Sequence, residues 1–285
     1  MKITIVGHGF VGKAVEYGFN TPGVRIQLVD PKYNVSLKDV KLQENIAFVC
    51  VPTPMGKDGV IDSSILVDTV KQLKKRMSGI IVIKSTVTPD IIKSLIRGSG
   101  GNTTTSGGNR IVYNPEFLTE KNAIDDFINP SMHIFGGENG IIDDLEYYYK
   151  EHSLCRPCPI HRMSAVDASY VKYGINSFLA MKVLFFNQFY DVIENGGGAY
   201  NKIVNAITSD SRIGPSHSAV PGLDGKRGYG GACFPKDTSA LFNHDKGFTL
   251  LGECVRINNE YRAMYQLDER EREQNVNYGQ AEEKQ

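Results

Sequence analysis

The first thirty residues place the strongest constraint on the fold of this 285-residue chain. An apolar run over 2–6 predicts a β-strand, and the glycine-rich sequence GHGFVG follows it over 7–12. A helical stretch to about residue 17 comes next, and then a second apolar run over 25–29. This order of strand, glycine-rich turn, helix and strand is typical of a βαβ unit with parallel strands. We therefore expect an α/β fold whose N-terminal part is a Rossmann-like, doubly wound sheet.

The glycines of this turn have the spacing of a dinucleotide-binding fingerprint. Gly7 allows the tight turn, Gly9 lets the backbone approach a pyrophosphate, and Gly12 lets helix and strand pack closely. Asp30 follows the second strand, where an acid would accept hydrogen bonds from the adenosine ribose, which favours NAD over NADP. The predicted cofactor contacts in this unit are Gly7, Gly9, Phe10, Val11, Gly12 and Asp30.

The alternation of strands and helices continues along the first half. Apolar runs predict strands over 46–51, 80–84, 111–113 and 132–135, and a helix over about 62–77. Because ligands of open α/β sheets bind beyond the carboxyl ends of the strands, Pro52, Thr53 and Thr86 fall on the expected binding side. Thr86 alone could equally cap a helix ahead of Pro89. The stretch 98–109 is rich in Gly, Ser, Thr and Asn and predicts a surface loop.

Two acidic residues lie between the last two predicted strands, in the sequence NPEFLTE over 114–120. A helix that begins after Pro115 would place Glu116 and Glu120 one turn apart on one face. Two like charges stacked in this way are mildly destabilising unless they serve a site. The alternative interpretation is a solvated face.

The second half is predicted to be helical. A long helix is expected over about 164–194, with Ser164 and Asp167 spaced as a capping box and glycines at 196–198 to end it. Apolar residues recur along it, so it is expected to cross between domains and to pack against a second copy in a homodimer. Lys172 and Asn176 are four residues apart and project from one face. The lysine either snorkels or is held near a site as a fixed positive charge.

The sequence GYGGACFPKD over 228–237 places Cys233 at the end of a glycine-rich loop. Proline favours the first turn of a helix, so Pro235 predicts a helix N-terminus at the cysteine. The helix dipole and the nearby Lys236 would both favour the thiolate. A buried structural cysteine is the alternative. Further helices are expected over about 199–210 and from 237 to about 265, followed by a polar tail over 266–285 that we expect to be disordered.

Composition excludes several classes of protein. The chain has 32 basic and 32 acidic residues, which gives no electrostatic case for nucleic acid or for an anionic membrane surface. It contains no apolar run of membrane-spanning length, and its first residues are predicted to form a strand and not a signal peptide. The five cysteines are scattered except for Cys155 and Cys158, so we expect no disulfide framework and a cytoplasmic location. We interpret this pair as two incidental thiols in a loop, and a metal site, which His152 and His161 would flank, is the alternative.

Together these motifs resemble the UDP-glucose 6-dehydrogenase family, within the UDP-glucose/GDP-mannose dehydrogenases. The resemblance covers about 1–262 and rests on seven motifs in the family's order. They lie at 7–12, 51–54, 84–87, 114–118, 172–180, 212–214 and 228–237.

The resemblance implies an NAD-dependent, four-electron oxidation of the C6 alcohol of UDP-glucose to UDP-glucuronate. It makes Cys233 the nucleophile, Lys172 and Asn176 the oxyanion stabilisers, and Asp237, Thr86 and Glu120 the groups that position and deprotonate the alcohol or the water. Further cofactor contacts would be Pro52, Thr53, Thr86, Glu116 and Lys236. Substrate contacts would be Phe117, Leu118, Glu120, Lys172, Asn176, Tyr229 and Gly230, with Arg212 reaching the substrate of the neighbouring subunit.

The chain would be a short form of the family without the usual C-terminal UDP-binding domain. Its expected organisation is an NAD-binding domain over 1–160, a helical dimerisation domain over 161–265 and the tail. Two alternatives remain open: the same chemistry on an N-acetylated UDP-hexosamine or GDP-mannose, and a non-catalytic NAD-binding partner subunit.

Overall fold

The computed structural model describes residues 1–42, 46–97 and 110–279. The chain divides into two compact units: residues 1–53 and 62–172 form the first, and residues 54–61 and 173–285 form the second. The domain boundaries predicted from the sequence stay a prediction.

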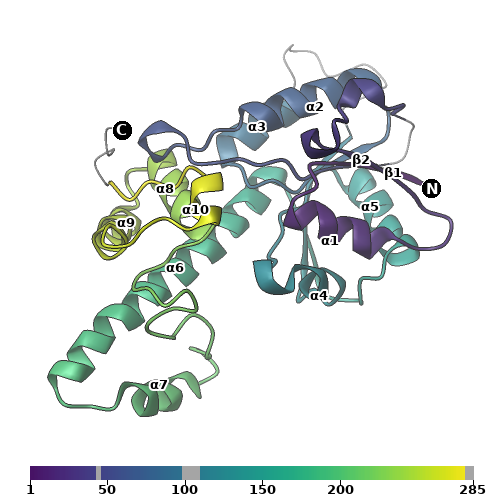
Figure 1. Ribbon diagram of the computed structural model, residues 1–285. Helices are drawn as coiled ribbons and strands as arrows, with labels where there is room; N and C mark the ends of the chain where they lie inside the picture. The colour runs from purple at the N-terminus through teal and green to yellow at the C-terminus, as the bar shows by residue number, and fades with distance from the viewer. Residues whose placement is uncertain (43–45, 98–109, 280–285) are drawn as a thin grey trace. The chain divides into compact units, whose positions relative to one another are not determined.

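The first unit is built on one sheet (Figure 1), and this sheet has seven strands in the order β2-β1-β3-β4-β5-β6-β7. Its strands are β1 (Lys2–Val6), β2 (Arg25–Val29), β3 (Ile46–Val49), β4 (Ile80–Ile83), β5 (Ile111–Tyr113), β6 (His133–Gly136) and β7 (Ile160–Met163). Neighbours from β2 to β5 are parallel, β6 is antiparallel to β5, and β7 is parallel to β6. The predicted α/β class with a doubly wound sheet is confirmed.

Helices cover both faces of this sheet. On one face, α2 (Ser64–Arg76) and α3 (Pro89–Arg97) share an apolar core with the strands. On the other face, α1 (Phe10–Phe19), α4 (Ala123–Ile128) and α5 (Asn139–His152) do so. Strands β3 and β4 are buried along their whole length because they lie in the middle of the sheet. Their continuous apolar runs are typical of such strands.

Two features of the first unit differ from the prediction. Strand β7 was missed because it is an edge strand with three exposed residues, and its polar sequence carries no burial pattern. The helix considered after Pro115 does not form there: the segment 114–119 is not helical, and helical structure begins at Glu120. The Glu116 carboxylate accepts a hydrogen bond from the Leu118 backbone at 2.7 Å, and such local side-chain bonds compete with a helix.

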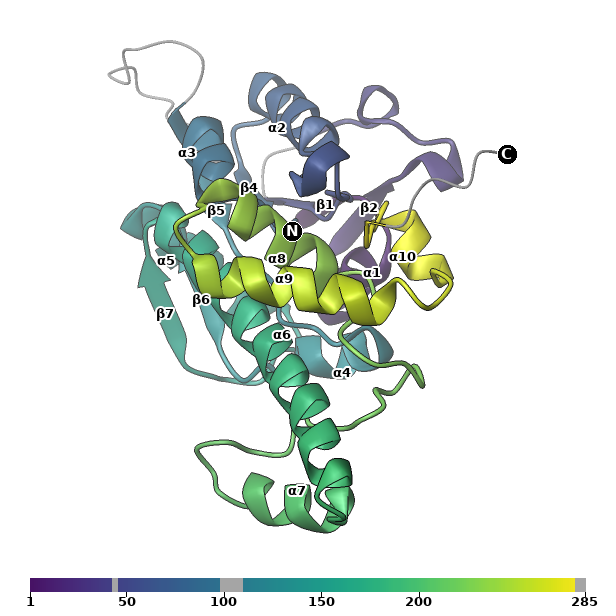
Figure 2. The same cartoon turned by 90° about the vertical axis from the view of Figure 1, so that its left-hand side faces the viewer.

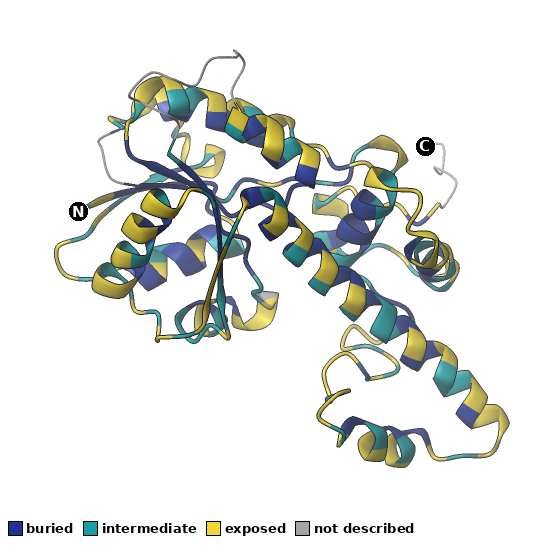
Figure 3. Cartoon of the chain, turned by 180° about the vertical axis from the view of Figure 1, so that it is seen from behind, coloured by how far each residue is buried: buried dark blue, intermediate teal, exposed yellow. Residues whose placement is uncertain are grey.

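The second unit is helical, as predicted. The long helix α6 (Ala165–Asn195) is continuous through the boundary between the units. It is followed by α7 (Tyr200–Thr208), α8 (Phe234–His244), α9 (Thr249–Arg262) and α10 (Glu269–Glu273). Helix α7 packs on the C-terminal part of α6, and α8 lies beside α9 (Figure 2). Buried and exposed residues alternate along α6 (Figure 3). Within the described ranges, no helix is long and apolar enough to cross a membrane.

The expectation of a disordered tail is wrong for residues 266–279. This segment contains α10, and it buries Glu271, Val276 and Tyr278. The charged composition of the tail predicted disorder, but the carboxylate of Glu271 is paired with Arg262 of α9. Residues 280–285 lie outside the described part of the chain.

Candidate active site

The glycine-rich turn after β1 leaves one position open. A Cβ atom on Gly7, whose φ is +87°, would lie 2.5 Å from the carbonyl oxygen of Cys50. A Cβ on Gly12 would lie 2.1 Å from the carbonyl oxygen of Gly7. A Cβ on Gly9, in contrast, would have no heavy atom within 4 Å. Gly9 immediately precedes α1, so the open space lies at a helix N-terminus, where backbone N–H groups attract phosphate.

Asp30 stands at the end of β2 and is tied to this turn. Its carboxylate accepts hydrogen bonds from the backbone N–H groups of His8 at 2.6 Å and Lys32 at 2.9 Å. Burial raises the pKa of Asp30, but these two bonds and the charge of Lys32 outweigh it and hold the pKa below its usual value. The group is therefore an anionic acceptor, as a ribose contact requires. An open Gly9 and an ionised Asp30 fit the adenosine half of NAD.

The sequence analysis did not identify His8 as part of this arrangement. Its ring is buried, with Nδ1 2.8 Å from the hydroxyl of Tyr33 and Nε2 2.7 Å from a carboxylate oxygen of Glu16. The side chain thus links α1 to the segment after β2. The sequence signal that could have identified His8 is its place as a polar residue between two glycines of the fingerprint.

The ends of β3 and β4 are joined by hydroxyl groups. Thr53 donates a hydrogen bond to the carbonyl oxygen of Thr86 at 2.9 Å, and Ser85 donates to that of Val51 at 2.7 Å. Both threonines are buried, at the carboxyl edge of the parallel strands. The structure thus brings Thr53 and Thr86 together on the expected side, whereas their contacts to a cofactor stay a prediction.

Glu116 and Lys172 form a buried ion pair in the first unit. The Lys172 ammonium lies 3.0 Å from a carboxylate oxygen of Glu116 and donates to its carbonyl oxygen at 2.6 Å. The same ammonium lies 5.3 Å from the ring centroid of Phe117. Since a buried charge is tolerated when it is paired, Glu116 supports Lys172 as a fixed cation. The sequence had assigned these two residues to separate roles.

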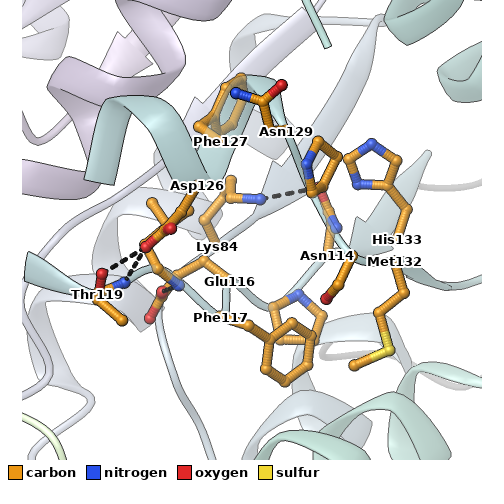
Figure 4. Close-up of a pocket in the computed structure, with 14 residues that line it drawn as sticks. Lys84, Asn114, Glu116, Phe117, Thr119, Asp126, Phe127, Asn129, Met132 and His133 are labelled. Carbon is orange, nitrogen blue, oxygen red and sulfur yellow. Dashed lines mark hydrogen bonds between the residues drawn. The ribbon is translucent and has the colours of Figure 1, made fainter. Parts of the chain in front are cut away.

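A pocket of about 180 Å³ in the first unit is lined in part by residues 114–119 (Figure 4). Its lining residues are Lys84, Asn114, Pro115, Glu116, Phe117, Leu118, Thr119, Asp126, Phe127, Asn129, Pro130, Ser131, Met132 and His133. The predicted substrate contacts Phe117 and Leu118 are among them. Asp126 accepts hydrogen bonds from the backbone and hydroxyl of Thr119.

Lys84 is the buried cation of this pocket. Its ammonium donates to the side-chain oxygen of Asn114 at 3.0 Å, and Tyr149 donates to the same oxygen at 2.7 Å. Burial lowers the pKa of Lys84 to about 8. Burial, together with the charge of Lys84, lowers the pKa of His133 to about 4. Lys84 and Asn114 were not predicted as site residues, although each directly follows a buried strand, a position that could have identified them.

Cys233 immediately precedes α8, and Pro235 lies in the first turn of that helix. The predicted place of the cysteine at a helix N-terminus is confirmed. The backbone N–H of Asp237 donates to the carbonyl oxygen of Cys233 at 2.9 Å. The Asp237 side chain is fully buried: one of its oxygens lies 2.5 Å from the ammonium of Lys236, and the other accepts from the Asn176 amide at 2.6 Å. Three of the predicted residues are therefore one hydrogen-bonded group.

The remaining predicted residues have different surroundings. Arg212 is exposed and lies 2.6 Å from a carboxylate oxygen of Asp210. The Tyr229 side chain is buried, with its hydroxyl 3.2 Å from that of Thr238, and its backbone is bonded to the Asn258 side chain. Gly230 lies against Arg262. The side chain of Glu120 lies outside the described part of the structure.

The predicted site residues thus fall into two groups, one in each unit. Thr53, Thr86, Glu116, Phe117, Leu118 and Lys172 belong to the first unit, together with the glycine-rich turn. Asn176, Arg212, Tyr229, Gly230, Cys233, Lys236 and Asp237 belong to the second. Lys172 and Asn176 are one helical turn apart on α6.

The cysteine pair lies beside the core of the first unit. The Cys155 thiol donates to the carbonyl oxygen of Phe127 at 3.1 Å, and burial raises the pKa of Cys155 to about 11. Burial also raises the pKa of Cys158. Among the residues that the structure describes, no three His, Cys, Asp or Glu side chains are grouped to hold a metal ion.

Comparison with known proteins shows two family matches. Residues 31–150 match the NAD-binding domain of the UDP-glucose/GDP-mannose dehydrogenase family, and residues 166–260 match its central domain. The UDP-glucose 6-dehydrogenase YwqF of Bacillus subtilis is 27% identical over 93% of this chain and 67% of its own length. The Rhizobium meliloti enzyme of the same name is 29% identical over 93% and 69%. TuaD of B. subtilis is 31% identical over 76% and 47%.

Solved structures share the fold. A UDP-glucose dehydrogenase from Pyrobaculum islandicum matches with a TM-score of 0.75 and 24% identity, over 93% of this chain and 69% of that one. A GDP-mannose dehydrogenase from Pseudomonas aeruginosa matches with a TM-score of 0.63 and 24% identity, over 92% and 69%. A UDP-D-ManNAc dehydrogenase from Pyrococcus horikoshii matches with a TM-score of 0.75 and 20% identity, over 93% and 69%.

Proposed function

Because this chain belongs to the UDP-glucose/GDP-mannose dehydrogenase family, we propose that it oxidises the C6 alcohol of UDP-glucose to the carboxylate of UDP-glucuronate, with NAD as cofactor. One observation carries the proposal beyond the family match. Cys233 opens α8, and the first turn of that helix holds a fully buried carboxylate, Asp237, that is bonded to Lys236 and Asn176. A cysteine at a helix N-terminus is in a setting that favours the thiolate.

The residues that would hold NAD are Gly7, Gly9, Phe10, Val11, Gly12, Asp30, Pro52, Thr53, Thr86 and Glu116 of the first unit, with Lys236 of the second. When bound, NAD supplies the hydride acceptor for both oxidations. Gly9 leaves room for the pyrophosphate, and Asp30 accepts hydrogen bonds from the ribose.

The chemistry on the protein runs through Cys233. Its thiolate adds to C6 of the aldehyde that the first oxidation yields, and a carbon–sulfur bond forms. Lys172, held by Glu116, stabilises the negative oxygen of this adduct with Asn176. The second oxidation leaves a thioester. Water then adds to its carbonyl carbon, the carbon–sulfur bond breaks, and the carboxylate and the thiolate are released.

Three groups handle the protons in this scheme. Thr86 and Glu120 position the sugar alcohol and the attacking water, and Asp237 takes up a proton from one of them. Both Asp237 oxygens are engaged by Lys236 and Asn176, which fixes the orientation of its carboxylate. Phe117, Leu118, Tyr229 and Gly230 would contact the substrate.

A homodimer through α6 is part of the proposal. Phe178, Phe185 and Val192 recur at intervals of seven residues along this helix and are 63%, 57% and 64% exposed. A second copy of the helix would cover this stripe, and the exposed Arg212 could then reach the neighbouring substrate. Sedimentation should show a dimer in the wild type and a monomer in Phe185→Ser. A monomeric wild type would contradict this part of the proposal.

The main test is the amount of NADH released per limiting UDP-glucose. We expect two NADH per sugar in the wild type and no complete oxidation in Cys233→Ala. Cys158→Ala, which removes a half-buried thiol of the first unit, should retain the wild-type yield. Two NADH per sugar in Cys233→Ala would overturn the role of the thiol.

A panel of nucleotide sugars tests the substrate. The structural neighbours include enzymes named for GDP-mannose and for UDP-D-ManNAc, so these two sugars and UDP-glucose should be compared. A higher kcat/KM on one of the others would move the proposal to that sugar. NAD binding without turnover of any would instead support a non-catalytic NAD-binding subunit.

A further inference from the structure

The carboxylate of Glu271 is the most deeply buried charge of the C-terminal segment. It belongs to residues 267–279, which we call the terminal strap, and it is 0% exposed. One of its oxygens accepts from the guanidinium of Arg262 at 2.7 Å, from the Tyr278 hydroxyl at 2.7 Å and from the Gly231 backbone at 3.3 Å. The other accepts from the Asp268 backbone at 2.9 Å. Burying a carboxylate is unfavourable unless its oxygens accept hydrogen bonds. Both oxygens of Glu271 do so, which indicates a specific contact between the strap and the residues around it.

The contact is made with the loop that leads to Cys233. A Cβ atom on Gly230 would lie 2.2 Å from a guanidinium nitrogen of Arg262 and 2.6 Å from the bonded oxygen of Glu271. Any larger residue at 230 would therefore have to displace this ion pair where the loop crosses it. Since Gly231 also donates to Glu271, the loop is fixed at two consecutive residues, and Cys233 follows two positions later.

Helix α9 holds the same loop one residue earlier. The backbone N–H of Tyr229 donates to the Asn258 side chain at 2.7 Å, and the Asn258 amide donates back to the Tyr229 carbonyl oxygen at 3.0 Å. The residues from Tyr229 to Gly231 thus lie between α9 and the terminal strap. Two side chains therefore hold this loop: Asn258 belongs to α9, whereas Glu271 belongs to the terminal strap that follows α9.

The other end of the strap is anchored within the same unit. The backbone N–H of Met55 donates to the carbonyl oxygen of Gln274 at 2.9 Å. Met55, Val276 and Tyr278 form a small buried apolar cluster, with Leu267 packed against it. These contacts, made by residues on both sides of Glu271, hold the strap in place without using the loop.

We propose that Glu271 is a positioning residue for Cys233: its carboxylate, with Arg262, fixes Gly230 and Gly231 and so sets the place of the thiol at the start of α8. The inference rests on the proposed role of Cys233. Glu271 acts through the loop and not on the substrate. A nucleophile displaced by about 1 Å can lose on the order of 100-fold in rate, so the effect should be measurable.

Glu271→Gln tests the proposal, because it keeps the shape and removes the charge. The matched control is Glu273→Gln, which changes an exposed glutamate of the same helix. The first measurement is the rate at which iodoacetamide alkylates Cys233 in the full chain, followed by mass spectrometry of the peptide that contains it. The second measurement is kcat and KM for the nucleotide sugar, which shows whether the substitution affects turnover or substrate binding.

We expect Glu271→Gln to lower the Cys233 alkylation rate and kcat by about 10-fold or more, with the affinity for NAD unchanged. Glu273→Gln should match the wild type in each. Alkylation does not depend on turnover, so it reports the thiolate character and accessibility of Cys233 even if this residue proves not to be catalytic. Wild-type alkylation and kcat in Glu271→Gln would overturn the proposal.

If Glu271→Gln fails to fold, as judged by circular dichroism, Tyr278→Phe replaces it. This change keeps the ion pair and removes one of the three donors to the carboxylate oxygen. We expect a loss of about five-fold in the alkylation rate and in kcat. A change in thermal stability with neither rate altered would show a structural role only and would overturn the proposal.

Discussion

Two glycine-rich loops in this chain each lead into a helix, and they use their glycines in opposite ways. In the loop after β1, a Cβ on Gly9 would meet nothing within 4 Å. In the loop before α8, a Cβ on Gly230 would run into the ion pair of Arg262 and Glu271. The first loop leaves space for a ligand, whereas the second makes room for the protein's own side chains. Similar composition therefore does not imply a similar task.

Two buried cations, Lys84 and Arg262, differ in the charge of their hydrogen-bond partners. Lys84 in the first unit donates to the neutral side chain of Asn114. Arg262 in the second unit is bonded to two carboxylates, those of Asp224 and Glu271. A buried charge without an opposite charge as hydrogen-bond partner tends to be neutralised, and a paired one is retained. The following predictions test both sides of this contrast.

The largest effect is expected for Gly12→Ala, because the new methyl would lie 2.1 Å from the backbone oxygen of Gly7. Backbone cannot move aside easily, so we expect a loss of about 3 kcal/mol in the free energy of unfolding, and the loss of NAD binding. Urea denaturation and calorimetry measure the two. Gly140→Ala is the control, since its position on α5 is open and exposed. Equal stability of both variants would contradict the close packing of this turn.

The buried Lys84 makes stability depend on pH. Its pKa falls from 10.5 to about 8 on folding, because burial disfavours the charged form. Between these values the unfolded chain holds a proton that the folded chain has released, so stability rises with pH across this window. Below about 8 both states are protonated, and the folded state bears the full penalty. The rise amounts to about 3 kcal/mol at 1.36 kcal/mol per pKa unit.

Lys84→Met isolates this contribution. We expect the difference in unfolding free energy between wild type and variant to move in favour of the wild type as pH rises from 7.5 to 10. The exposed Lys71→Met should show no such change relative to the wild type. If the difference in unfolding free energy between wild type and Lys84→Met did not change with pH, folding would not lower the pKa of Lys84.

An intermediate effect is expected for Gly230→Ala, which tests the closed loop. The methyl would press on the guanidinium of Arg262, a side-chain group that can shift more readily than backbone. We expect a loss of about 2 kcal/mol in the free energy of unfolding and a lower kcat, without a change in NAD affinity. Weaker NAD binding with unchanged stability would instead assign Gly230 to the cofactor.

The smallest change in stability is expected for Gly9→Ala, which tests the open loop. Its backbone is extended, with φ of −74°, and is accessible to alanine, but alanine is a poorer N-cap than glycine, so stability should fall by no more than about 1 kcal/mol. The methyl would occupy the space predicted for the pyrophosphate, and we expect NAD affinity to fall about 10-fold, which is about 1.4 kcal/mol. Unchanged affinity in titration calorimetry would remove the phosphate from this position.

Local signals predicted much of the fold. Central strands such as β3 and β4 need apolar residues on both faces, which makes them visible as continuous runs. The place of Cys233 followed from Pro235, since proline fits the first turn of a helix. Strand β7, at the edge of the sheet, offered no such pattern and was missed.

The sequence by itself determined the α/β class, the dinucleotide fingerprint and the helix that begins directly after Cys233, because each depends on residues that are close together in the chain. Only the tertiary structure decided which charges meet. Lys172 is paired with Glu116, 56 residues away, and Glu271 with Arg262 of another helix. The free energy of a buried charge depends on its partners in space, so composition alone predicted a disordered tail where the folded chain has a buried ion pair.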